Sequence, residues 1–136
     1  MAGPKKKKVV VLGSTGSIGQ SALKVARNLP EHMEVVGLGA ARSVGKLAGQ
    51  LAETGAKHAC LSDPDSAQSL AAQLSDDITL YSGEDGLVEL ATLEEADIVL
   101  VSIVGVAGLR PALAALEAGK DLAVASKEIL VMAGEQ

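Results

Sequence analysis

Residues 8–19 read Lys-Val-Val-Val-Leu-Gly-Ser-Thr-Gly-Ser-Ile-Gly, an apolar run followed by three glycines spaced three residues apart. The run predicts a short, fully buried strand that ends at Gly13. Apolar residues then recur at helical spacing as far as Leu29, and Pro30 ends the predicted helix. A buried strand, a glycine turn and a helix in this order are typical of the first unit of a doubly wound α/β domain.

The three glycines of this turn have different predicted tasks. Gly13 lets the chain leave the strand in a tight turn, and Gly19 lets the helix pack closely on the strand. Gly16 has no side chain, so a pyrophosphate can approach the backbone there. The spacing differs from that of an ATP-binding P-loop, because no Lys-Ser or Lys-Thr pair follows the last glycine.

Backbone amides at the start of the helix form the predicted anion site. The free N–H groups and the helix dipole of a helix N-terminus attract an anion, and the hydroxyls of Ser14, Thr15 and Ser17 can donate further bonds. The alternative is a purely structural turn. The residues predicted to contact the pyrophosphate are Thr15, Gly16, Ser17 and Ile18.

The rest of the chain alternates between strand and helix patterns. We predict strands at residues 34–40, 58–61, 78–81, 97–102 and 122–125. We predict helices at residues 44–54, 83–92 and 111–118, one capped by Ser62 or Asp63 with Pro64 in its first turn, and one opening near Lys127. This alternation predicts one Rossmann-like α/β domain over residues 1–136, with a doubly wound, mostly parallel sheet and helices on both faces. Residues 1–6 are expected to be flexible, and the end at Gln136 resembles a break inside a longer protein.

Composition supports this fold and narrows the function. Apolar residues make up 48% of the chain, with no Phe, no Trp and one Tyr, so the core must be aliphatic, as in a parallel sheet covered on both faces. A net charge of −5 argues against a nucleic-acid surface, and Lys5–Lys8 is more typical of a solvated end. No apolar stretch approaches the roughly 20 residues that span a bilayer. A single cysteine, Cys60, fits a reducing cytoplasm and is expected to be a buried, inert thiol.

The end of the second predicted strand indicates which dinucleotide binds. An NAD site has an acidic residue there for the ribose 2′-hydroxyl, whereas residues 39–43 read Gly-Ala-Ala-Arg-Ser. Arg42 offers a permanently charged, planar donor for a 2′-phosphate, and Ser43 adds a hydroxyl. The pattern therefore favours NADPH, the alternative being that Arg42 is a solvated surface arginine.

A second group of polar residues, Ser126, Lys127 and Glu128, follows the last predicted strand, at the edge where doubly wound sheets bind ligands. Lys127 can meet a substrate phosphate or hydroxyl, and Glu128 can pair with it or with a cofactor group; an ordinary surface ion pair is the alternative. Glycines in residues 102–108 lie on the same edge, where they either admit a nicotinamide ribose or form an ordinary loop.

We assign no catalytic residue and no metal ligand. His32 and His58 have no Cys or carboxylate at metal-ligand spacing. The acidic pairs are interpreted as helix caps and solvated charges; they are Asp63/Asp65, Asp76/Asp77 and Glu94/Glu95.

Several stretches occur in an order that resembles the N-terminal domain of the 1-deoxy-D-xylulose 5-phosphate reductoisomerase family. They are Leu12-Gly-Ser-Thr-Gly-Ser-Ile-Gly19, Asn28-Leu-Pro-Glu-His32, Ser102-Ile-Val-Gly-Val-Ala-Gly-Leu109, Ala118-Gly-Lys120 and Ala125-Ser-Lys-Glu-Ile-Leu-Val131. The resemblance runs from about Lys7 to Glu135. It implies an NADPH-dependent enzyme that rearranges and reduces a ketose phosphate to 2-C-methyl-D-erythritol 4-phosphate, in the non-mevalonate route to isoprenoid precursors.

The resemblance also implies roles for individual residues. Residues 15–18 would contact the pyrophosphate of NADPH. Ala41, Arg42 and Ser43 match the family's 2′-phosphate loop, although Ala41 and Ser43 replace its usual Gly and Asn. Ser126, in place of the usual Asn, and Glu128 would contact NADPH, and Lys127 would contact the substrate.

The family's Mn²⁺ or Mg²⁺ carboxylates, flexible loop and homodimer-forming region all lie beyond the last match. The chain is therefore expected to bind cofactor without turnover. Its partners are expected to be small molecules, not nucleic acid or membrane, and its location cytoplasmic. Two alternatives stay open: the NADP-binding domain of a related reductase, and a nucleotide-sensing module without chemistry.

Overall fold

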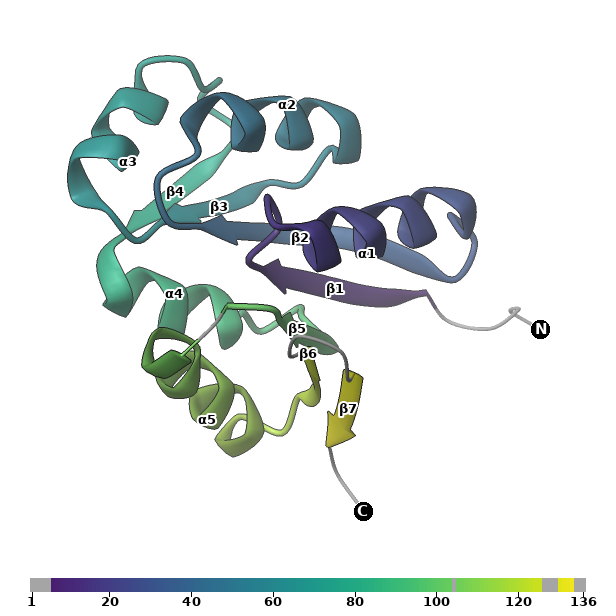
Figure 1. Ribbon diagram of the computed structural model, residues 1–136. Helices are drawn as coiled ribbons and strands as arrows, with labels where there is room; N and C mark the ends of the chain where they lie inside the picture. Colours follow the sequence, from purple (N-terminus) through teal and green to yellow (C-terminus); the bar gives the residue numbers. More distant parts are fainter. Residues whose placement is uncertain (1–5, 104, 126–129, 134–136) are drawn as a thin grey trace.

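The computed structural model describes residues 6–103, 105–125 and 130–133, and within these ranges it is a seven-stranded sheet with helices on both faces (Figure 1). The strand order is β4-β3-β2-β1-β5-β6-β7, and every neighbouring pair is parallel except β6 with β7. The strands are β1 (Lys7–Leu12), β2 (Met33–Ala40), β3 (His58–Leu61), β4 (Thr79–Ser82), β5 (Ile98–Val101), β6 (Asp121–Ala125) and β7 (Leu130–Ala133). The predicted Rossmann-like fold class is confirmed.

The helices divide between the two faces of the sheet. Helices α1, α2 and α3 lie on one face, and α4 and α5 lie on the other (Figure 1). Their bounds are α1 (Ser17–Asn28), α2 (Val44–Thr54), α3 (Pro64–Ala71), α4 (Gly83–Ala91) and α5 (Leu109–Glu117), with a short 3-10 helix η1 (Gly105–Gly108) before α5. The chain winds outward from β1 to β4 and then crosses back to β5 on the other side of β1. The carboxyl ends of β1 and β5 therefore form the switch point where doubly wound sheets bind ligands.

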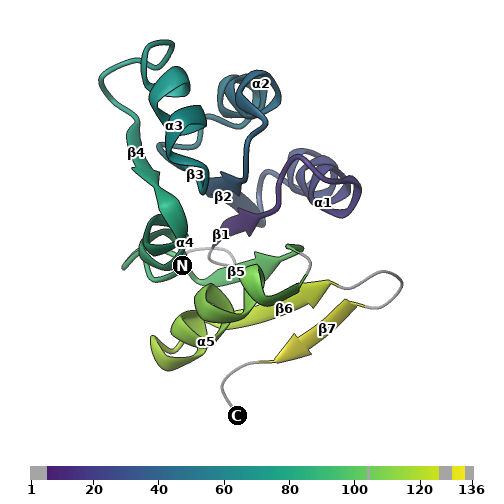
Figure 2. The same cartoon turned by 60° about the vertical axis from the view of Figure 1, so that its left-hand side comes forward.

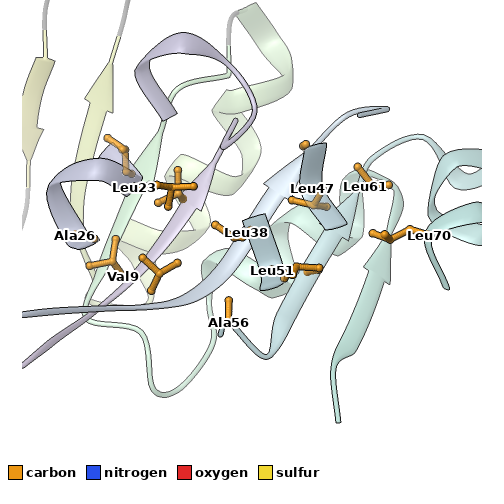
Figure 3. Close-up of a cluster of buried hydrophobic side chains, with 14 of the residues drawn as sticks. Val9, Leu23, Ala26, Leu38, Leu47, Leu51, Ala56, Leu61 and Leu70 are labelled. Carbon is orange, nitrogen blue, oxygen red and sulfur yellow. The ribbon is translucent and has the colours of Figure 1, made fainter. Parts of the chain in front are cut away.

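Strand β1 shows why an unbroken apolar run suits the centre of this sheet. Val9 and Val11 belong to the core cluster under α1–α3, whereas Val10 and Leu12 belong to the cluster under α4 and α5. Successive side chains of a strand point to opposite faces, so both faces need apolar residues when both are covered. Figure 3 shows the first cluster, in which Leu23, Leu47, Leu51 and Leu70 from three helices meet the sheet.

Cys60 of β3 confirms the expected buried thiol. Its side chain is fully buried, and its Sγ lies 3.7 Å from the carbonyl oxygen of Gly83. Burial, with a smaller contribution from the negative charge of Glu89, raises the pKa of the Cys60 thiol to about 12. The thiol is therefore protonated at neutral pH and unreactive.

The predicted elements up to residue 125 occur within about two residues of their expected bounds, the normal uncertainty of helix ends. Asp63, not Ser62, caps α3 by accepting from the amide of Ser66. The predicted helix near Lys127 is wrong for residues 130–133, which form β7 and pair antiparallel with the outer edge of β6 (Figure 2). This apolar segment pairs with an open strand edge, and that tertiary contact overrides its local helical preference.

Residues 1–6 were predicted to be flexible, and residues 1–5 of these lie outside the described part of the chain. Among the helices that the structure describes, none has the length and apolarity to cross a bilayer.

Candidate dinucleotide-binding site

The glycine turn connects the carboxyl end of β1 to α1 and lies against the carboxyl end of β2. Gly13 has a φ of +89°, a conformation that glycine adopts without strain, which confirms the predicted tight turn. The amides of Gly13 and Ser14 both donate to the carbonyl oxygen of Gly39, at 2.7 Å and 3.0 Å. The start of the turn is thus held against the end of β2.

Gly19 and Gly16 lack side chains for different reasons. A Cβ added at Gly19 would overlap the carbonyl oxygen of Gly13 and lie 2.7 Å from the Cα of Ser14, so α1 can approach the turn only with glycine there. A Cβ added at Gly16 would lie at an ordinary 3.6 Å from the Gly13 carbonyl oxygen, and φ there is −78°. Internal packing does not require glycine at position 16, which leaves close approach of a ligand as the reason for it.

The N-terminus of α1 has the character of an anion site. Gly16 is its N-cap residue, no side chain caps the helix, and its first turn holds no acidic residue. Within the described residues, the amides of Thr15, Ser17 and Ile18 have no hydrogen-bond acceptor, whereas that of Gly16 donates to the Gly13 carbonyl at 3.2 Å. Three of the four predicted amides are therefore available to an anion.

The hydroxyls of the turn do not all face outward. Ser17 is exposed and Thr15 is half-buried, as a ligand contact requires. Ser14 is fully buried, so the expectation that its hydroxyl donates to a ligand is wrong.

The predicted 2′-phosphate loop lies at the same edge, between β2 and α2. Ala41 and Arg42 are exposed, and Ser43 is the N-cap residue of α2 without a side-chain capping bond. Arg42 forms no ion pair with any residue that the structure describes. The carboxyl of Asp63 is near enough for Arg42 to contribute to lowering its pKa, although hydrogen bonds from Ser66 are the larger cause. The Arg42 guanidinium is therefore free to meet an anionic group.

Ser102, which directly follows β5, links the carboxyl end of β5 to the carboxyl end of β1. Its Oγ lies 3.0 Å from the carbonyl oxygen of Leu12 and 3.1 Å from that of Gly13, so it donates to the end of β1 and the start of the turn. Farther along this loop, a Cβ added at Gly108 would lie 2.8 Å from the Ile103 carbonyl oxygen. Packing accounts for Gly108, in agreement with the ordinary-loop alternative.

Two glutamines that the sequence did not single out also contact the turn. Gln50 Nε2 of α2 donates to the Ser14 carbonyl at 2.8 Å, and Gln20 Nε2 of α1 donates to the Thr15 carbonyl at 2.7 Å. A signal for Gln50 exists in the sequence, because it stands on the apolar stripe of its helix between Leu47 and Leu51.

Ser126, Lys127 and Glu128 lie outside the described residues, so the structure does not test their predicted contacts. Within the ranges that it describes, no three His, Cys, Asp or Glu side chains come close enough together to hold a metal ion. The described ranges by themselves therefore supply no complete set of metal ligands.

A groove of about 560 Å³ is lined by residues of α1, α2 and the start of β2, and none of its lining residues belongs to the glycine turn. Residues from the amino-terminal side of the sheet, including Lys6, Pro30 and Glu34, form much of its lining, and neither Gly16 nor Arg42 does. The amides and the guanidinium that lack partners among the described residues lie at the carboxyl edge, outside this groove.

The fold and this edge define a class: doubly wound α/β domains with the glycine turn of dinucleotide-binding proteins. Residues 9–134 match the family model described as 1-deoxy-D-xylulose 5-phosphate reductoisomerase. The chain belongs to this family, as its motifs indicated.

Curated relatives with that name include proteins from Aliivibrio salmonicida (strain LFI1238), 44% identical over 132 residues, and Thermoanaerobacter sp. (strain X514), 43% identical over 129 residues. Each alignment covers 95% of this chain, but only 33% and 34% of the relatives. The chain thus spans about a third of their length.

Solved structures of the family superpose closely on the model. The reductoisomerase from Zymomonas mobilis in complex with NADPH has a TM-score of 0.84 at 38% identity, covering 90% of this chain and 32% of that one. A DOX-P reductoisomerase in complex with magnesium has a TM-score of 0.86 at 37% identity, covering 91% and 32%. The backbone of this domain is therefore shared with these enzymes.

Proposed function

We propose that this chain is the NADPH-binding part of a 1-deoxy-D-xylulose 5-phosphate reductoisomerase. One observation carries the proposal: the amides at the N-terminus of α1 and the guanidinium of Arg42, which have no partners among the described residues, lie at the same edge of the sheet. The amides of Thr15, Ser17 and Ile18 would bind the pyrophosphate. The family relative solved with NADPH supports this assignment.

Selectivity for NADPH over NADH would reside in the loop after β2. Arg42 would bind the 2′-phosphate, with Ser43 and the backbone of Ala41 beside it. No acidic residue stands at positions 39–43 to accept a bond from an NADH ribose hydroxyl.

In the whole protein, this domain would present NADPH to the sugar phosphate during conversion to 2-C-methyl-D-erythritol 4-phosphate. Ser126 and Glu128 would contact the cofactor, and Lys127 the substrate. Solved relatives in complex with fosmidomycin and magnesium support a small phosphorylated substrate and a divalent metal, Mg²⁺ or Mn²⁺, in the longer enzyme. That enzyme would be a cytoplasmic homodimer.

Isothermal titration calorimetry of the chain with NADPH and with NADH tests the proposal. We expect NADPH to bind at one site and at least tenfold more tightly than NADH, the size of effect of one charge-assisted phosphate contact, about 1.5–3 kcal/mol. Equal affinities for both cofactors, or no binding of either, would refute it.

A further inference from the structure

We propose that Gln50 of α2 is a positioning residue for the pyrophosphate site. It would act by fixing the orientation of the Ser14–Thr15 peptide unit. The inference rests on the proposed function, because it concerns how the same site is held ready for its ligand.

The contact itself is long-range and buried. Gln50 Nε2 donates to the Ser14 carbonyl oxygen at 2.8 Å across 36 residues of sequence, and the Gln50 side chain is only 9% exposed. The two residues belong to different βα units, so the bond links the glycine turn to the next helix of the same layer.

The bond from Gln50 to the Ser14 carbonyl also determines the direction in which the Thr15 amide points, because both groups belong to one planar peptide unit. In a trans peptide the C=O and the following N–H point in opposite directions. Because the Ser14 carbonyl points inward to Gln50, the Thr15 amide must point away from α2. That amide has no acceptor among the described residues, and Thr15 is one of the predicted pyrophosphate contacts.

The next peptide unit, Thr15–Gly16, is held differently, and its side-chain partner is Gln20. Gln20 donates to the Thr15 carbonyl, but the amide of that peptide unit, Gly16 N–H, already donates to the Gly13 carbonyl. The Thr15–Gly16 unit is therefore held at both ends by the protein, whereas the Ser14–Thr15 unit is held at its carbonyl end. Without Gln50, the Ser14–Thr15 peptide could rotate and present a carbonyl oxygen to the pyrophosphate.

The Gln50 side chain lies in a buried environment that is only partly satisfied by hydrogen bonds. Its Oε1 and the Oγ of Ser14 are both buried without a hydrogen-bond partner among the described residues. An apolar residue between Leu47 and Leu51 would remove the unpaired Oε1, but it would leave the buried Ser14 carbonyl oxygen without its donor. Among the described residues, the bond to the Ser14 carbonyl is the only hydrogen bond of the Gln50 side chain, so this side chain serves the glycine turn.

The test compares two probes on Gln50→Met, which keeps the length of the side chain but cannot donate. NADPH needs the turn, whereas adenosine 2′-phosphate carries the Arg42 contact without a pyrophosphate. We expect the Kd for NADPH to rise about tenfold or more, the loss typical of one such hydrogen bond, while the Kd for adenosine 2′-phosphate changes less than twofold. Gln68→Met, the same change on the exposed face of α3, should alter neither.

A second variant keeps the proposal testable if Gln50→Met folds poorly. In Gln50→Glu the side chain can donate only when its carboxyl is protonated, and burial raises the pKa of a carboxyl. Measured against the unmutated chain, the affinity of Gln50→Glu for NADP⁺ should therefore recover as the pH falls from about 8.5 to 5.5.

The outcomes separate this inference from the proposed function. If the unmutated chain binds NADPH and Gln50→Met binds it equally well, or if both probes weaken together, the positioning role is wrong and the function stands. A Gln50→Glu variant whose relative affinity does not depend on pH would also overturn the role. If the unmutated chain does not bind NADPH at all, the proposed function itself fails.

Discussion

Gly19 faces Gly13 so closely that a Cβ at position 19 would overlap the Gly13 carbonyl oxygen. The contact is backbone to backbone, so no flexible side chain can move to relieve it. The N-terminus of α1 can therefore pack against the turn only because residue 19 has no Cβ atom. This relationship makes the stability of the turn testable.

Gly19→Ala should destabilise the fold by about 1–3 kcal/mol or more, the usual result of overpacking a rigid site. Gly49→Ala is the matched control, because a Cβ at this exposed position in α2 meets nothing within 4 Å. That change should stabilise the chain by about 0.5–1 kcal/mol, since alanine favours a helix interior. Urea denaturation measures both free energies, and an equally stable Gly19→Ala variant would contradict the packing argument.

Gly16→Val should abolish dinucleotide binding while leaving the fold intact. The position has an extended backbone conformation and room for a Cβ, so the fold tolerates a side chain that would occupy the place of the pyrophosphate. Circular dichroism should show an unchanged helix content, and calorimetry should show no NADPH binding. A folded variant with normal affinity would mean that the ligand lies elsewhere.

Arg42→Ala should remove most of the preference for NADPH over NADH. One charge-assisted contact contributes about 1.5–3 kcal/mol, so the ratio of the two Kd values should fall roughly tenfold or more. Arg27→Ala, at the far end of α1, should leave the ratio unchanged. The prediction fails if Arg42→Ala weakens both cofactors equally, because the 2′-phosphate would then have another partner.

Cys60 should make stability depend on pH in the alkaline range. Its pKa is raised from 9.0 to about 12 in the folded chain, so its contribution is fully present below pH 9 and is lost as the pH rises toward 12. Urea denaturation between pH 8 and 11 should show a steeper loss for the unmutated chain than for Cys60→Ala. If the two chains lose stability with pH at the same rate, the thiol ionises as readily in the folded state as in the unfolded state.

The chain alone should not turn over 1-deoxy-D-xylulose 5-phosphate. The described residues bring no three metal-ligating side chains together, and rearranging a ketose phosphate needs a Lewis acid on its oxygens. NADPH oxidation should stay at the background rate with Mn²⁺ present, although NADPH binds. Metal-dependent turnover would place a metal site among the acidic residues that we interpret as helix caps and solvated charges.

The sequence by itself determined the fold class, the glycine turn and the position of Arg42. These follow from local patterns: an apolar run, glycines at fixed spacing, and the residues directly after a strand. The match of β1, α1 and β2 to their predicted ranges reflects that strand and helix periods are properties of contiguous residues.

Only the tertiary structure decided how the turn is held. The bonds from Gln50 to Ser14 and from Ser102 to Gly13 join residues 36 and 89 positions apart, and they depend on which strands and helices become neighbours. The same holds for β7, whose residues pair with the open edge of β6 instead of continuing into a helix. Local spacing specifies what a segment can form, whereas long-range packing selects its partners and therefore the direction in which Ser14 and the Thr15 amide point.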